Sequence, residues 1–285
     1  WMLAHGTTTW EAKSGYGLDR ETELAQLRAI RGEGGIPTWL GAHAVPLEFP
    51  GADEYLEFAL RDVLPEAAPL AEAADVFLER GAFDAAQARR YLSACADHGL
   101  ALRLHGDQFT ESGGVPLAVE LAARSVDHLE ATGPEGVRTL AASGVAAVLL
   151  PVAALFLDRP MPPARALADA GAVIALASDF NPGSAFCESL PLVCSLACTQ
   201  LGLRPAEALA ACTVNAAHVL DRGDRLGRLA EGYSADLLLL DAPDWRYLAY
   251  HLAGDEPGLV VKEGLVAWKR GGEGASARGG RAAAA

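Results

Sequence analysis

Short apolar runs alternate along this chain with longer segments in which apolar residues recur every three or four positions. The runs are bounded by glycine, proline or polar residues, and they are too short for helices, so they predict strands. Seven such strands are expected, at Gly6–Ala12, Pro37–His43, Asp75–Arg80, Ala101–Gly106, Ser125–Glu130, Val145–Pro151 and Val173–Asp179. Regular alternation of strand and helix predicts βαβ units and a parallel sheet.

The intervening segments have the periodicity of amphipathic helices. Six helices are predicted between the strands, at Arg20–Arg31, Ala52–Leu64, Asp84–His98, Val115–Ala123, Pro134–Ser143 and Pro162–Ala170. Two more follow the last strand, at Glu188–Leu201 and Arg204–Leu220. Asp84 has the side chain of an N-cap residue. Both a doubly wound sheet and a (β/α)8 barrel are built from such units.

Polar residues at or just after the strand ends favour the barrel. They are Lys13, Tyr16, His43, His105, Gln108, His128, Asp179 and Asn181. Barrel enzymes draw active residues from the C-terminal ends of many strands, whereas an open sheet gathers them at one switch point. No GxGxxG motif opens a helix after the first strand, and no GxxxxGK[ST] motif occurs. Because a barrel needs eight strands, we predict a TIM-like barrel whose first strand is missing.

The pattern changes after Asp221. SADLLLLD predicts a short strand, and GLVVKEGLVAWKRG predicts a hairpin whose turn is Lys262–Gly264. A few strands alone are marginally stable and need a partner sheet. We expect residues 1–221 to form the barrel, 222–270 to form these additional strands, and the low-complexity residues 271–285 to form a disordered tail.

Composition narrows the class of protein. The 285 residues are 51% hydrophobic and carry a net charge of −14, so a substantial core is expected and no basic surface is available for nucleic acid or anionic membrane. No apolar run approaches the ~20 residues of a membrane helix. The five cysteines form no CxxC pair, and Cys194 and Cys198 have helical spacing. Buried thiols and a reducing cytoplasm are therefore expected.

His43, His105 and His128 carry the candidate chemistry. A lone histidine at a strand end is more often a core residue than a ligand, but three of them with Asp179 form a donor set typical of Zn²⁺ or Fe. Such an ion makes hydroxide available near pH 7. Asp179 also has the chemistry of an N-cap. The turn Asn181–Ser184 has backbone amides that suit a substrate carboxylate.

The remaining histidines are interpreted as structural or surface residues. They are His5, His98, His218 and His251. His98 lies near a predicted helix C-terminus, where a histidine is favoured by the helix dipole.

Several motifs in order resemble the imidazolonepropionases of histidine degradation, in the amidohydrolase superfamily. The motifs are HGTTTWEAKSGYGL, GAHAVP, LHGDQ, SVDHLE, VLLP and ASDFNPGS, and the likeness extends from His5 to about Trp268. It implies a (β/α)8 barrel with a small β-sandwich. It also implies hydrolysis of the small molecule 4-imidazolone-5-propanoate to N-formimidoyl-L-glutamate with one Zn²⁺ or Fe ion.

The resemblance also assigns roles. His105 and Asp179 match metal ligands, and His128 matches a histidine beside the metal-bound water, so His128 and Asp179 are the expected catalytic residues. The matched substrate-binding positions are Tyr16, His43, Gln108, Asn181, Gly183 and Ser184. Some relatives have glutamate where this chain has Gln108. Because an amide does not titrate near neutral pH, a binding role is expected there.

The chain departs from the family in one respect. The family's other two ligands form an H-x-H pair on the first barrel strand, followed by a substrate-binding arginine, and this sequence contains no H-x-H. We therefore expect an N-terminally truncated imidazolonepropionase, with weak metal binding and little activity of its own. Sequencing the coding DNA upstream of Trp1 tests this expectation, because an in-frame H-x-H would complete the site.

Two other interpretations stay open. One is another amidohydrolase, similar to cytosine deaminase or dihydroorotase. A two-metal site bridged by a carboxylated lysine is disfavoured, because of the three lysines only Lys13 lies near a barrel strand. The other is a truncated remnant or binding protein without catalytic activity. The sequence leaves a homodimer open as the assembly.

Overall fold

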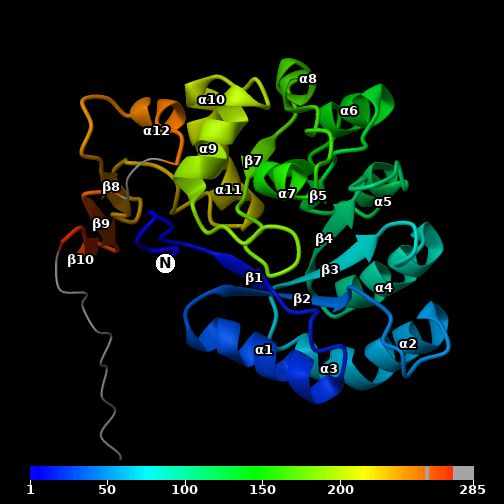
Figure 1. Ribbon diagram of the computed structural model, residues 1–285. Coiled ribbons are helices and arrows are strands. Elements are labelled where there is room, and N and C mark those ends of the chain that lie inside the picture. The colour runs from blue at the N-terminus through cyan, green and yellow to red at the C-terminus, as the bar shows by residue number, and fades with distance from the viewer. Residues whose placement is uncertain (254–256, 272–285) are drawn as a thin grey trace, which may run out of the picture.

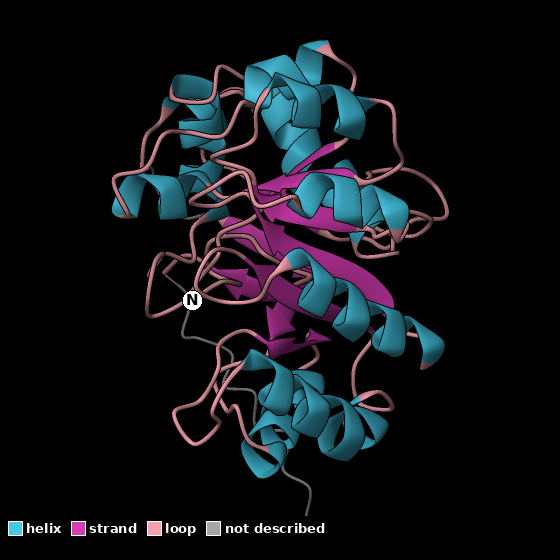
Figure 2. Cartoon of the chain, turned by 90° about the vertical axis from the view of Figure 1, so that its right-hand side faces the viewer, coloured by secondary structure: helices cyan, strands magenta, loops and turns pink. Residues whose placement is uncertain are grey.

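Seven parallel strands form the main sheet of the computed structural model, which describes residues 1–253 and 257–271. The strands pair in chain order, and helices surround the curled sheet on its outside (Figures 1 and 2). They are β1 (Glu11–Lys13), β2 (Ile36–Ala42), β3 (Ala73–Leu78), β4 (Ala101–Gly106), β5 (Ser125–His128), β6 (Ala146–Leu149) and β7 (Ile174–Leu176). All seven predicted strands are confirmed. Within the described ranges the sheet is open, with β1 and β7 at its edges.

The helices lie between the strands as predicted. They are α1 (Arg20–Gly32), α2 (Ala52–Phe58), α3 (Leu64–Ala67), α4 (Ala85–Asp97), α5 (Gly114–Glu120), α6 (Pro134–Ala141), α7 (Pro151–Phe156), α8 (Ala164–Asp169), α9 (Leu190–Thr199), α10 (Pro205–Cys212) and α11 (Val214–Val219). Asp84 caps α4 as predicted. Its carboxylate accepts from the Gln87 backbone N–H at 2.9 Å, and the Gln87 side-chain oxygen accepts from the Asp84 backbone N–H at 3.0 Å.

Several predicted boundaries are wrong. The expected helix Ala52–Leu64 contains a π-helical segment, η1 (Ala59–Val63), and Arg204–Leu220 is divided at Thr213. The first strand covers only Glu11–Lys13 instead of Gly6–Ala12. The predicted strand Val145–Pro151 stops at Leu149, because Pro151 begins the unpredicted helix α7, and proline is well suited to the first turn of a helix.

Aromatic residues in the core fix the C-terminal half of β2. Trp39 is fully buried with its ring 5.2 Å from that of Tyr91. The Tyr91 hydroxyl donates to the Trp39 carbonyl at 3.2 Å and accepts from the Gly41 N–H at 3.1 Å. Tyr55 donates to the Gly41 carbonyl at 2.7 Å. These bonds hold the strand that delivers His43, directly after β2, to the C-terminal side of the sheet.

A three-stranded antiparallel sheet follows the barrel elements. It pairs in the order β10 (Leu265–Lys269), β9 (Leu259–Lys262), β8 (Leu237–Leu239), which confirms the predicted strand and hairpin. Glu263 and Gly264 make the turn with φ of 52° and 80°. The short helix α12 (Tyr247–Tyr250) was not predicted; the Ser195 hydroxyl of α9 donates to the Ala249 carbonyl at 2.9 Å.

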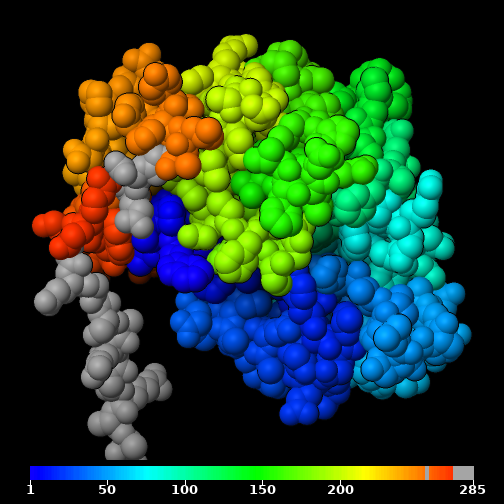
Figure 3. All heavy atoms as spheres, in the orientation of Figure 1, coloured from blue at the N-terminus to red at the C-terminus, as the bar shows by residue number. Residues whose placement is uncertain are grey.

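The first residues of the chain lie against this small sheet (Figure 3). A Cβ added to Gly6 would approach the Leu238 side chain of β8 within 2.7 Å. The predicted division at residues 221 and 222 stays a prediction. The predicted disordered tail lies outside the described residues apart from Gly271. In the described ranges, no helix is both long and apolar enough to cross a membrane.

Candidate functional site

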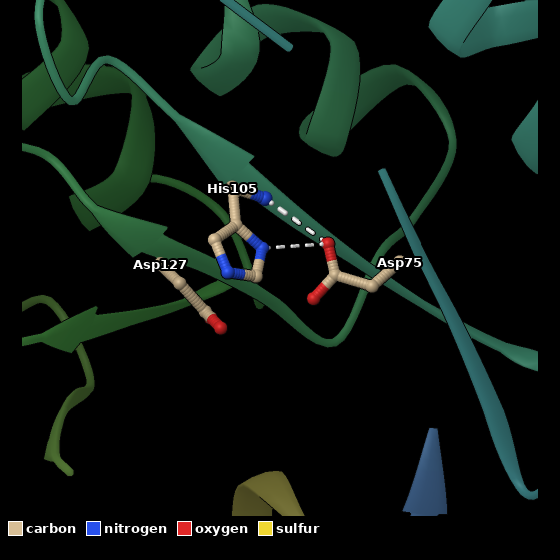
Figure 4. A group of neighbouring side chains, drawn as sticks. All are labelled: Asp75, His105 and Asp127. Carbon is tan, nitrogen blue, oxygen red and sulfur yellow. Dashed lines mark hydrogen bonds and ion pairs between the residues drawn. The ribbon is translucent and has the colours of Figure 1, made fainter. Parts of the chain in front are cut away.

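Three neighbouring strands place Asp75, His105 and Asp127 on the same side of the sheet. His105 of β4 is in register with Asp127 of β5 on one side and with Phe77 of β3 on the other. Asp75 lies two residues before Phe77 on β3. Side chains two residues apart share a face, so parallel register brings the three together. Figure 4 shows them pointing toward one another. Among the described residues, these form the one group of three or more potential metal ligands with ligand atoms within 4.8 Å of one another.

Asp75 orients His105. One carboxylate oxygen of Asp75 accepts from the His105 backbone N–H at 3.1 Å and lies 3.0 Å from the His105 Nδ1 atom. Burial alone would raise the pKa of Asp75, but the charges of His105 and Lys13 outweigh it and hold the pKa well below its usual value. The carboxylate therefore accepts a hydrogen bond from Nδ1–H of His105, so Nε2 is the nitrogen that can coordinate a metal when the ring is neutral.

Lys13, at the end of β1, forms ion pairs with both carboxylates. Its Nζ atom lies 2.5 Å from Asp75 Oδ2 and also contacts Asp127 Oδ2. The other Asp127 oxygen accepts from the Ser125 hydroxyl at 3.0 Å. Burial would lower the pKa of Lys13, but Asp127 and Asp75 raise it well above its ordinary value, so the amine is charged. A charged ammonium between these carboxylates fits a single metal held by His105 better than two metals bridged by a carboxylated lysine.

Replacing Asp75 with asparagine should weaken zinc binding by about 10- to 100-fold, the usual cost of losing a partner of a coordinating histidine. An amide can donate to Nδ1, which then moves the ring proton to Nε2 and blocks coordination. Zinc titration of D75N against wild type measures this effect. Asp84→Asn is the matched control, because it keeps a capping residue away from the site. Equal zinc affinity in D75N and wild type would contradict the role of Asp75.

His128 lies beside His105 at the end of β5. Their ring centroids are 5.2 Å apart, and His128 is buried. Its Nδ1 atom is 3.5 Å from Glu130 Oε1. His128 and Leu129 have φ of 82° and 72°, an uncommon left-handed conformation for non-glycine residues that is found at functional sites. The structure therefore brings together the predicted ligand and the predicted proton-transferring histidine.

Tyr16 and His43 form a second pair at the site. Their rings meet edge to face with centroids 5.0 Å apart, and Nδ1 of His43 lies 2.8 Å from the Gly15 carbonyl oxygen. A carbonyl only accepts, so Nδ1 carries the proton and Nε2 is left as an acceptor. Burial lowers the pKa of His43, which favours this neutral ring. Phe77 lies between His43 and His105, 6.2 Å and 6.1 Å from their rings.

The segment after β7 folds into a compact turn. The Asn181 side-chain oxygen accepts from the Gly183 and Ser184 N–H groups at 2.8 Å, and its NH₂ group donates to the Asp179 carbonyl at 2.7 Å. The Ser184 hydroxyl donates to Asp179 Oδ2 at 3.4 Å. The two amides expected to bind a carboxylate are thus bonded within the turn. The turn does not cap α9 either, because Ser189 does so.

Asp179 lies outside the Asp75–His105–Asp127 cluster but faces Tyr16. Burial, and then the charge of Asp179, raise the pKa of the Tyr16 hydroxyl. His5, near the start of the chain, lies 3.7 Å from Glu188 in the segment after β7. The loops after β1 and β7 therefore approach each other at the edges of the open sheet.

Gln108 is buried in the loop after β4, between two anchored neighbours. Asp107 accepts from the Ser112 N–H at 3.0 Å and the Thr132 hydroxyl at 2.9 Å. Glu79 accepts from the Phe109 N–H at 2.8 Å. These bonds fix the loop backbone on both sides of Gln108.

Sequence reasoning missed Asp75, Asp127 and Glu130, and it did not anticipate that Lys13 pairs with both aspartates. A signal was present, because Asp75 and Asp127 interrupt apolar strand runs, and a buried charge inside such a run needs a partner. The partners lie on other strands, 62 and 114 residues from Lys13.

Comparisons with known proteins agree with this fold. Residues 79–280 match the amidohydrolase family. The chain is 68% identical over 270 residues to imidazolonepropionase of Rubrobacter xylanophilus and 48% identical over 286 residues to that of Chloroflexus aggregans. Each match covers 93% of this chain but only 65% and 66% of the relative, so the chain spans just under two thirds of their length.

Solved structures show the same fold at low sequence identity. A zinc-bound adenosine deaminase from Xanthomonas campestris has a TM-score of 0.68 at 19% identity, covering 94% of this chain and 67% of its own. N-isopropylammelide isopropylaminohydrolase from Burkholderia multivorans has a TM-score of 0.68 at 22% identity, covering 93% and 72%. Together with the family match, these likenesses confirm the predicted TIM-like barrel fold of the amidohydrolase type.

Proposed function

We propose that this chain, which belongs to the amidohydrolase family, carries the binding and proton-transfer residues for hydrolysis of 4-imidazolone-5-propanoate to N-formimidoyl-L-glutamate. The observation that carries the proposal is the convergence of His105, His128 and the Tyr16–His43 pair at one end of the sheet. The 68% identity to an imidazolonepropionase supports this substrate over those of other amidohydrolases.

His105, through Nε2, and Asp179 are proposed to hold one Zn²⁺ or Fe ion. His105 suits this role, because Asp75 fixes its tautomer and Lys13 pairs with the adjacent carboxylates, whereas Asp179 lies outside that cluster. When bound, such an ion supplies a water of lowered pKa. The family's H-x-H ligands have no counterpart in this sequence, so the expectation of weak metal binding by this chain stays a prediction.

His128 is proposed to move the proton between the attacking water and the ring nitrogen that leaves. Tyr16, His43 and Gln108 bind the imidazolone end of the substrate: Nε2 of His43 accepts an N–H, and the Gln108 amide donates or accepts without titrating. The turn of Asn181, Gly183 and Ser184 is proposed to contact the substrate from the opposite edge of the sheet. This is supported by Tyr16, whose hydroxyl pKa is raised by burial and then by the charge of the neighbouring Asp179.

Ring-opening assays test the proposal. The chain alone should bind zinc weakly and hydrolyse little imidazolone propanoate. Fused to a relative's segment that carries the H-x-H pair, it should open that ring and leave cytosine intact. Hydrolysis of cytosine instead would favour another amidohydrolase activity. A well-folded fusion with no hydrolysis would favour a non-catalytic protein, and tight one-to-one zinc binding by the chain alone would contradict the predicted weakness.

A further inference from the structure

A buried carboxylate organises the loop that carries Tyr16, although it belongs to neither a strand end nor the metal cluster. Glu23, in the first half of α1, is 2% exposed. Its oxygens accept from the Gly15 N–H at 2.9 and 3.0 Å, the Gly17 N–H at 2.8 Å and the Leu18 N–H at 3.1 Å. Three backbone amides of one short loop therefore converge on a single side chain, through charge-assisted hydrogen bonds.

The two glycines of the KSGYGL sequence are required by this arrangement. Gly15 has φ of 99°, and a Cβ there would lie 2.6 Å from the Leu40 carbonyl oxygen. A Cβ on Gly17 would lie 2.8 Å from the Glu23 nitrogen and 3.0 Å from Glu23 Oε1. The loop can wrap around the carboxylate only because neither position has a side chain.

The wrapped loop in turn sets the state of His43. Gly15 makes both bonds: its N–H donates to Glu23, and its carbonyl oxygen accepts from Nδ1 of His43. Tyr16 lies between the two anchored glycines, with its ring against that of His43. Releasing the amides would free the Gly15 carbonyl to turn away, and His43 would lose the bond that selects its tautomer.

We propose that Glu23 is a positioning residue for substrate binding, which holds the loop of residues 13–18 so that Tyr16 and the Nε2 acceptor of His43 face the imidazolone ring. The role of the loop toward that ring rests on the proposed function. The anchoring of the loop and the tautomer of His43 are properties of the protein without substrate.

Glu23→Gln and Glu23→Ala test the anchor on the chain itself, with Glu21→Gln as control because Glu21 is exposed on the same helical turn. Hydrogen exchange of the Gly15, Gly17 and Leu18 amides should speed up by about tenfold or more in E23Q, because a neutral amide accepts more weakly than a carboxylate. In ¹⁵N spectra of the histidine rings, His43 should change from the Nδ1–H form to a mixture of tautomers. E23Q should lie between wild type and E23A in both measurements.

In the fusion that carries the H-x-H pair, E23Q should raise KM for imidazolone propanoate about tenfold and leave kcat within about threefold. This pattern is expected when an interaction that binds substrate and transition state equally is lost. Unchanged amide exchange and an unchanged His43 spectrum in E23Q would overturn the proposal, as would a fall in kcat at constant KM. Absence of hydrolysis in the fusion with an unaltered Glu23 would refute the proposed function alone, because the exchange and tautomer measurements need no substrate and still decide whether Glu23 is the anchor.

Discussion

Lys13→Met should lower the free energy of unfolding by about 3–5 kcal/mol at neutral pH, because removing one partner of a buried ion pair leaves uncompensated charge. Here one ammonium serves two carboxylates, whose side chains are 0% and 7% exposed. Methionine keeps the apolar stem, so the loss is mainly electrostatic. Urea unfolding of K13M measures the effect, and Lys269→Met, on the exposed last strand, is the matched control with little expected change.

The destabilisation should depend on pH. In the wild type the pKa of Asp75 is depressed, because His105 and Lys13 outweigh the effect of burial. A depressed carboxylate contributes stability above its unfolded pKa of ~3.9, and that contribution is lost only as pH falls through the lower folded value. Without Lys13, only His105 opposes the effect of burial, so Asp75 takes up a proton at a higher pH than in the wild type.

The difference between K13M and wild type should therefore shrink from pH 7.5 to pH 5. The double variant K13M/D127N should recover part of the lost stability at pH 7.5, since it removes one of the two unpaired charges. If K13M lowered the free energy of unfolding by less than about 1 kcal/mol, as for an exposed ion pair, Lys13 would not stabilise the fold as a buried partner of the two carboxylates. A loss of unfolding free energy that does not change with pH would contradict the expected role of Lys13 as well.

The order of strands and helices could be predicted because local pattern determines it. β2, β3, β6 and β7 are largely apolar runs, and the covering helices repeat apolar residues on one face. Predicted element boundaries were wrong where one residue can belong to either of two adjacent elements. Pro151 ends the apolar run of β6 and also begins α7, so the run alone could not separate strand from helix.

The candidate site could be predicted only in part, for a similar reason. His105 and His128 stand at strand ends, where sequence position alone marks the C-terminal face of a barrel. Glu23 lies inside an amphipathic helix and looks like any surface glutamate in sequence. Its burial depends on the loop of Gly15 and Gly17 folding back over α1, which no local pattern encodes.

The contacts of Lys13 show the same limit across the sheet. Its partners Asp75 and Asp127 come from the third and fifth strands, so their approach depends on curvature and register over several strands. Sequence could indicate that each charge needs a partner but not which one. That curvature brings Lys13 into contact with both carboxylates.

His128→Asn should lower kcat for ring opening by about 10²- to 10⁴-fold, the usual contribution of a proton-transferring residue, with a smaller effect on KM. Asparagine can form hydrogen bonds but cannot carry the proton. It is also among the residues that best tolerate a positive φ such as the 82° at this position, so the fold should survive. The assay uses the fusion that carries the H-x-H pair. His98→Asn is the control, because His98 is an exposed residue at the C-terminal end of α4.

Zinc affinity separates proton transfer from metal binding at this pair of histidines. H128N should keep the zinc affinity of the wild type, because the His128 ring lies beside the His105 ring and its Nδ1 faces Glu130. His105→Asn should lose zinc binding and activity together. If H128N also lost its zinc, His128 would be a ligand instead of a proton carrier. If H128N kept kcat within about threefold of wild type, a group other than His128 would have to move the proton.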